Sequence, residues 1–163
     1  MTKERLEEYY KQFYGLVYRV AFTQVKTRSD AEDVAQEVFI KLMRYSPHFD
    51  NEEHEKAWMI RTTINQCHNL IKNKWHGIVL GIEKIPEEEK QYFTVPYVQE
   101  DETLWAVLEL KEQYRNSLYL FYYEDYSIKE IAACENMPEN TVKTNLKRGR
   151  EALKKILGKK DSY

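Results

Sequence analysis

One stretch of the chain carries most of the information about its fold: residues 126–146, which read YSIKEIAACENMPENTVKTNL. Ser127 and Glu130 are three residues apart, the spacing of a capping box, in which a hydroxyl and a carboxylate satisfy the free amides at a helix start. Residues 135–138, ENMP, interrupt the helical pattern, and a longer helix is predicted to run on to about Leu157. Short helix, tight break and longer helix together are typical of a helix-turn-helix.

The longer helix of such a motif enters the major groove of DNA and presents its early residues to base edges. Eight basic residues and one acidic residue lie between Thr141 and Lys160. Basic residues alone would more simply indicate a solvated helix, but the capped helix and the break before it favour DNA binding. The predicted contacts with bases or phosphates lie opposite the apolar stripe that Val142 and Leu146 begin; they are Thr141, Lys143, Thr144, Lys147 and Arg148.

The first 75 residues contain one glycine and one proline, and their apolar residues recur at helical spacing. A first helix is predicted to carry one apolar face, formed by Leu6, Tyr9, Tyr10, Phe13, Val17, Val20 and Ala21. A second is predicted to start at the capping box of Ser29 and Glu32. Its outward residues Asp33, Gln36 and Glu37 would, by periodicity alone, be ordinary solvated surface.

A third helix follows the break at residues 46–51 and has an unusual outer face. An aromatic residue shares this face with amides and cations at spacings of three and four; its members are Trp58, Arg61, Thr62, Asn65, Asn69 and Lys72. Indoles stack on bases, and asparagine reads base edges of an unpaired strand, so the face suits single-stranded DNA. The adjacent residues 49–56 could wall a pocket for an extruded base. Ordinary surface, with Trp58 covering a loop, is the alternative.

Helical periodicity fails over residues 76–100, where glycines, prolines and a run of three glutamates predict a linker. Two further helices are predicted at residues 103–112 and 114–123, before the helix-turn-helix. The 163 residues are thus predicted to form an all-α protein of two small helical domains, 1–75 and 101–163, joined by a flexible linker. The net charge is −2, but the final segment from Tyr126 carries nine basic and five acidic residues, 9 − 5 = +4, which favours a polyanionic partner there.

Several classes of function are excluded or disfavoured. Apolar runs are far shorter than the roughly 20 residues of a bilayer span, and the N-terminus is charged, so a cytoplasmic location is expected. Cys67 and Cys134 are far apart and the histidines lack ligand spacing, so neither a disulfide nor a metal site is expected. No phosphate loop or hydrolase motif occurs, and we therefore expect no catalysis, no cofactor and no small-molecule substrate.

Three stretches together resemble the extracytoplasmic-function class of sigma factors of bacterial RNA polymerase. The stretches are DAEDVAQEVF at residues 30–39, the helix from Ala57 to Asn69, and the helix-turn-helix segments 126–132 and 137–143. The resemblance implies that Asp33, Gln36 and Glu37 face core RNA polymerase. It further implies that the outer face of the third helix recognises and melts the minus-10 element, and that the helix-turn-helix reads the minus-35 duplex.

The resemblance also implies control by an anti-sigma protein, often one anchored in the membrane. Four positions depart from the pattern: Asn136 and Asn140 replace common glycines, Glu135 replaces a common leucine, and Asn145 replaces a common cation. Asparagine tolerates a left-handed backbone, so the turn is predicted to survive. The nearest rival interpretation is a stand-alone helix-turn-helix regulator that binds duplex DNA as a dimer, and a more distant one is a helical adaptor with a basic tail.

Overall fold

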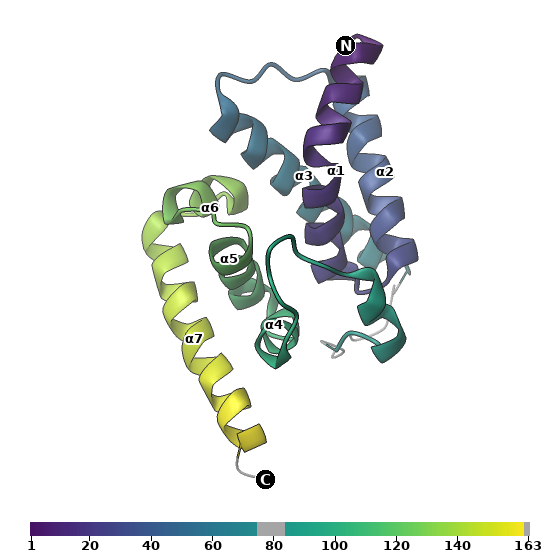
Figure 1. Cartoon of the computed structure of the whole chain (residues 1–163). Helices are drawn as coiled ribbons and strands as arrows, with labels where there is room; N and C mark the ends of the chain where they lie inside the picture. Colours follow the sequence, from purple (N-terminus) through teal and green to yellow (C-terminus); the bar gives the residue numbers. More distant parts are fainter. Residues whose placement is uncertain (75–83, 162–163) are drawn as a thin grey trace. The chain divides into compact units, whose positions relative to one another are not determined.

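The computed structural model describes residues 1–74 and 84–161, and the described part is built from helices without any strand (Figure 1). The predicted all-α class is therefore confirmed. The helices, in chain order, are α1 Lys3–Val25, α2 Arg28–Tyr45, α3 Glu52–Lys74, the 3-10 helix η1 Glu87–Tyr92, α4 Glu102–Leu108, α5 Glu112–Tyr123, α6 Ile128–Glu135 and α7 Glu139–Asp161.

The chain divides into two compact units. The first unit contains α1, α2, α3 and η1, and the second contains α4 to α7. Each unit has its own apolar core, as expected when amphipathic helices must bury one face against a neighbour.

In the first unit, α1 packs against both α2 and α3. Val17 and Ala21 of α1 and Val34 of α2 are fully buried. On α3, the residues at helical spacing Ala57, Ile60, Ile64 and Cys67 are buried as well, whereas Ile71, predicted to continue this stripe, is only partly buried. Tyr10 differs from the rest of the predicted apolar face of α1, because its side chain is 49% exposed. It stacks on Tyr14 with ring centroids 4.7 Å apart instead of entering the core.

The predicted start of α2 was wrong by two residues. The N-cap is Thr27, whose backbone is extended and whose Oγ1 accepts the Asp30 amide at 3.3 Å. The carboxylate of Glu89, from η1, accepts the amide of Arg28 at 2.9 Å. These two acceptors satisfy the first free amides of the helix, so Ser29 lies inside the first turn rather than before it.

Part of the predicted linker folds onto the first unit, which the sequence did not indicate. We call residues 86–93 the strap. Phe93 is fully buried and its ring stacks on Phe22 at 5.1 Å. Tyr18 donates its hydroxyl to the Tyr92 carbonyl at 2.8 Å, and burial raises the pKa of Tyr18 to about 12, which keeps it a donor at neutral pH.

The second unit contains the predicted helix-turn-helix. Ser127 Oγ accepts the Glu130 amide at 3.1 Å while Glu130 Oε1 accepts the Ser127 amide at 3.0 Å, so the capping box that starts α6 is confirmed. The helix ends at Asn136, which adopts the left-handed backbone at φ 53°. The turn therefore survives without glycine there. α7 then buries Val142 and Leu146 in the unit, and its buried Gly149 approaches α5.

Cys67 and Cys134 are both buried, and the Cys67 thiol donates to the Ala21 carbonyl at 3.9 Å. None of the described helices combines the length and apolarity that a membrane span requires.

Candidate nucleic-acid interfaces

The outer face of α3 lies at the surface of the first unit. We define the α3 face by the six predicted residues, of which Arg61, Asn65, Asn69 and Lys72 are exposed, and Trp58 and Thr62 are partly buried. The Trp58 indole meets the Phe49 ring edge-on, with centroids 5.9 Å apart. The indole thus packs against Phe49 while part of the side chain stays accessible, and an accessible indole can stack on a base.

A hollow of about 510 Å³ lies beside the α3 face, between the start of α1 and the loop that precedes α3. Tyr9 and Phe49 supply aromatic surface, and their ring centroids are 6.1 Å apart. Arg5 donates to the Tyr9 hydroxyl at 2.9 Å and covers its ring. Glu55 also lines the hollow, and burial raises the pKa of its carboxyl.

Aromatic and polar side chains line the hollow, and Phe49, Asn51, Glu52 and Glu55, from residues 49–56, form part of its wall. The residues of the α3 face do not line it. Phe49 connects the two, because it lines the hollow and contacts Trp58.

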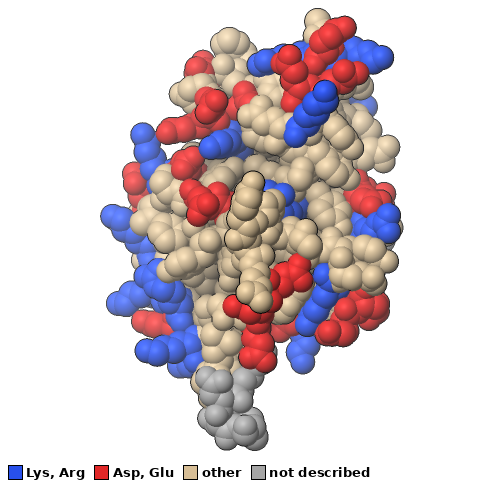
Figure 2. Space-filling model, viewed as in Figure 1, with Lys and Arg blue, Asp and Glu red and all other residues tan. Residues whose placement is uncertain are grey.

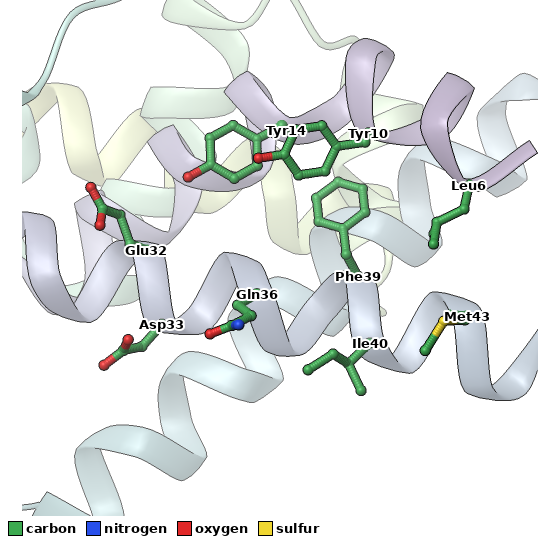
Figure 3. A pocket seen from close by; sticks show the side chains of 9 residues that line it. All are labelled: Leu6, Tyr10, Tyr14, Glu32, Asp33, Gln36, Phe39, Ile40 and Met43. Carbon is green, nitrogen blue, oxygen red and sulfur yellow. The ribbon is translucent and has the colours of Figure 1, made fainter. Parts of the chain in front are cut away.

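The predicted polymerase-facing residues Asp33, Gln36 and Glu37 are all exposed on α2. Asp33 and Gln36 border an open groove of about 470 Å³ between α1 and α2, whereas Glu37 does not line it. Figure 3 shows that Tyr10 and Tyr14 enter this groove from α1, opposite residues of α2 that include Phe39 and Met43. The acidic surface therefore adjoins an apolar one, which includes Leu6 and Tyr10 of the predicted apolar face of α1.

The sequence contains a pattern that indicates one side of this groove. Tyr10, Tyr14 and Tyr18 recur every four residues along α1, and an aromatic row at that spacing lies on one side of a helix. Met43 is 50% exposed, which is unusual for a large apolar side chain. A side chain that combines exposure with an apolar neighbour is typical of a protein-binding surface.

The second helix of the helix-turn-helix exposes all the residues predicted to meet DNA. We define the α7 face as Thr141, Lys143, Thr144, Lys147 and Arg148, which are exposed, whereas Val142 and Leu146 between them are buried. Lys and Arg side chains gather along α7 in Figure 2. Thr144 donates its hydroxyl to the Asn140 carbonyl at 3.0 Å, which leaves the hydroxyl oxygen as an acceptor and the methyl group as an apolar contact for a partner.

The departures around the turn have structural explanations. Asn145 is buried at 8% exposure and donates from Nδ2 to the sulfur of Met137 at 3.7 Å. It therefore braces the turn from inside and is not placed on the α7 face. Glu135 is partly buried, and its Oε2 accepts the Ser117 hydroxyl at 3.0 Å. Burial, the largest cause, raises the pKa of Glu135 to about 7.

These features define a helix-turn-helix DNA-binding protein that carries a second helical module with its own aromatic and amide-rich face. Models of two protein families match the chain: sigma-70 region 2 at residues 9–77 and sigma-70 region 4 at residues 104–153. The chain belongs to the sigma-70 family, and within it to the extracytoplasmic-function sigma factors. It is thus a sigma factor, which binds core RNA polymerase and directs transcription initiation at promoters.

Relatives and solved structures agree with this assignment. The chain is 29% identical over 154 residues to the extracytoplasmic-function sigma factor SigW of Bacillus subtilis, covering 86% of this chain and 82% of SigW. It is 28% identical over 147 residues to SigV of the same organism, covering 88% and 86%. The sigma factor RpoE from Bartonella quintana, solved with the anti-sigma factor NepR, has a similar fold: TM-score 0.73, 17% identity, and coverage of 95% and 98%.

The family assignment favours a sigma factor over the stand-alone dimeric regulator. Members of this family are initiation factors rather than enzymes.

Proposed function

We propose that the three surfaces divide the work of promoter recognition. Asp33, Gln36 and Glu37, with the adjoining groove, bind core polymerase; the α3 face captures the melted minus-10 strand; and the α7 face reads the minus-35 duplex. The observation that carries this proposal is the contrast between the two nucleic-acid surfaces. One presents a supported indole among amides, and the other presents cations on a helix shaped for the major groove.

The hollow beside the α3 face supports a base-capture step. An extruded base costs stacking energy, and an aromatic lining offsets part of that cost. Phe49 provides such a lining and contacts Trp58, and the buried Tyr9 ring packs beside Phe49. The remaining energy for unpairing comes from polymerase, to which both modules are tethered, and tethering raises their local concentration at the promoter.

We also propose residues 1–75 and 101–163 as the two functional modules, with the strap belonging to the first. We place the protein in the cytoplasm, without a catalytic activity, cofactor, metal or small-molecule substrate of its own. Its regulator in this proposal is an anti-sigma protein, either soluble or anchored in the membrane. Two solved structures of similar fold support this part of the proposal. RpoE was solved with the anti-sigma factor NepR, and the protein CnrH was solved with the cytosolic domain of its partner CnrY.

Reconstitution tests the proposal as a whole. Purified chain is added to sigma-free core polymerase, and initiation sites are mapped on a genomic DNA library. Initiation at defined sites that share two elements supports the proposal. Binding to a palindrome as a dimer, without initiation, would instead indicate a stand-alone regulator.

Asn65→Ala tests the α3 face. We expect promoter opening to fall while affinity for core polymerase is unchanged, because Asn65 is exposed on α3, its amide is assigned to the unpaired strand, and the proposed polymerase-binding residues are on α2. Gln66→Ala is the matched control: it removes an amide of the neighbouring residue, about 100° around the helix, and should leave opening intact. Equal losses of opening and polymerase binding would remove Asn65 from the site.

Lys143→Ala tests the α7 face. If Lys143 neutralises a phosphate, the magnitude of the slope of log affinity against log salt should fall by about 0.9. If it reads a base, the binding free energy should weaken by about 1–3 kcal/mol, and the preference at one base pair should be relaxed. Lys111→Ala, an exposed lysine at the start of α5, is the control. Affinity and salt slope both equal to those of the control would contradict the assignment.

A further inference from the structure

The carboxyl group of Glu135 occupies an unusual place for an acid. It is the last residue of α6, directly before the turn that aims α7. Its Oε2 accepts the hydroxyl of Ser117, which is fully buried on α5, and it also hydrogen-bonds Asn116. The hydrogen bonds from Ser117 and Asn116 favour the ionised carboxylate, but the loss of water on burial has the larger effect and favours the neutral acid.

The surrounding charges act in the same direction. Glu112, one turn ahead of Asn116 on α5, repels a negative charge at Glu135. The C-terminal end of α6 carries the negative end of the helix dipole, and it disfavours an anion as well. On α7, the residue that reaches the turn is Asn145, which is neutral. Among the described residues, no lysine or arginine stabilises the Glu135 carboxylate.

The turn next to Glu135 is held by few contacts. The Met137 amide donates to the Ala132 carbonyl at 3.0 Å, and Asn145 reaches the Met137 sulfur. Asn136 must stay in the left-handed region, which for a residue other than glycine depends on its surroundings. If the ionised Glu135 carboxylate moves toward water, the turn directly after it is displaced, and the position of α7 changes with the turn.

We propose that Glu135 is a proton-sensitive joint of the helix-turn-helix: its neutral form keeps the turn packed against α5, and its ionised form loosens the turn and the seating of α7. The group has the required titration range, because burial and Glu112 raise its pKa to about 7. The direction follows from linkage. An acid whose pKa is raised in the packed state stabilises that state at low pH, and the stabilisation is lost as pH rises from the ordinary value of 4.5 through 7.

The Glu135 carboxyl titrates near pH 7 when the turn is packed and near its ordinary value of 4.5 when the turn is open. This difference in pKa changes the equilibrium constant for opening of the turn by about tenfold between pH 6 and pH 8. Met137 provides a local reporter, because its amide hydrogen bond spans the turn. We therefore expect the protection of the Met137 amide against hydrogen exchange, in the full chain, to fall about tenfold from pH 6 to pH 8 after correction for intrinsic exchange. The amide of Ser46, bonded to Leu42 in the first unit, serves as the internal control and should not change.

Two variants separate a proton switch from a merely structural role. Glu135→Gln keeps the shape and the hydrogen bonding without titrating, so its Met137 protection should be independent of pH. Glu112→Gln keeps Glu135 but removes the repelling charge, so the midpoint should move to lower pH. Carboxyl carbon NMR of Glu135 in the full chain should show the same midpoints as the exchange data.

Loss of pH dependence in Glu135→Gln together with a shifted midpoint in Glu112→Gln supports the proposal. Constant protection of Met137 in the unmodified chain overturns it, as does pH dependence that persists in Glu135→Gln. The exchange experiment needs no DNA, so it succeeds or fails independently of the assignment of α7 to the minus-35 element. The consequence for DNA rests on that assignment: promoter affinity of the reconstituted holoenzyme should weaken by up to about tenfold over the same range, and not in Glu135→Gln.

Discussion

Gly149→Ala probes how closely α7 approaches α5. A Cβ at this position would lie 2.9 Å from Leu118 Cδ1 and 3.1 Å from Tyr114 Cβ. Tyr114 Cβ is attached directly to the α5 backbone and cannot yield without moving the helix, whereas Leu118 Cδ1 can move only by a rotation of a fully buried side chain. Overpacking of this kind costs about 1–3 kcal/mol, while replacing glycine by alanine within a helix gains about 1 kcal/mol. The expected net result is a loss of between about 0 and 2 kcal/mol.

Gly158→Ala in the same helix isolates the packing component. A Cβ there meets no atom within 4 Å, so only the helix-propensity gain remains, reduced because the helix ends at Asp161. Gly149→Ala should therefore be less stable than Gly158→Ala by the overpacking cost of about 1–3 kcal/mol, less the part of the propensity gain that is lost near the helix end. Urea unfolding of both variants, followed by NMR signals of the second unit, measures that difference. Equal stabilisation by the two alanines would refute the close crossing of α5 and α7.

Two further variants test features of the first unit that the sequence did not disclose. Phe93→Ala removes a fully buried ring that stacks on Phe22, a change that usually costs about 3–5 kcal/mol. Because the strap can detach while the three long helices stay folded, we expect faster tryptic cleavage after Lys90 and only a limited loss of stability in the first unit. An unchanged cleavage rate would contradict the docking of the strap. Thr27→Ala should destabilise the first unit by about 1 kcal/mol, because Thr27 caps α2, whereas Ser29→Ala should stay within about 0.5 kcal/mol. The reverse order in thermal unfolding would restore Ser29 as the cap.

The helix-turn-helix was predictable because each of its signals is local. The capping box needs only Ser127 and Glu130, and the inner stripe of α7 follows from the spacing of Val142 and Leu146. Local chemistry also foresaw that Asn136 could hold the left-handed turn. When capping, turn and periodicity agree, a short segment specifies its own structure.

The start of α2 was not decided by local chemistry. Both Thr27 and Ser29 are good N-cap residues, and Ser29 has a glutamate three positions later. The choice depends on Glu89, sixty-one residues further along the chain, which accepts the Arg28 amide. A distant acceptor leaves no trace in the local pattern, so the sequence favoured the wrong cap.

The strap and the groove escaped prediction for a related reason. A 3-10 helix of six residues has too few turns for a periodic signal, and the strap is held mainly by Phe93, Glu89 and the Tyr92 carbonyl. In α1, spacing shows that Tyr10 lies on the apolar side but not that the neighbouring helices leave this part of the side uncovered. Burial depends on which element covers a face, and only the tertiary arrangement determines that.

The positions where this chain departs from its family pattern cluster at the turn before α7. Asn136 supplies the left-handed residue, Asn145 contacts Met137 from within, and Glu135 bonds to Ser117. A glycine and a leucine would hold the same turn by backbone freedom and apolar packing, neither of which responds to protons. Polar contacts in a partly buried site respond strongly, because desolvation magnifies each charge. The substitutions therefore convert a passive turn into one whose geometry depends on ionisation, and they do so at the point that sets the direction of the DNA-binding helix.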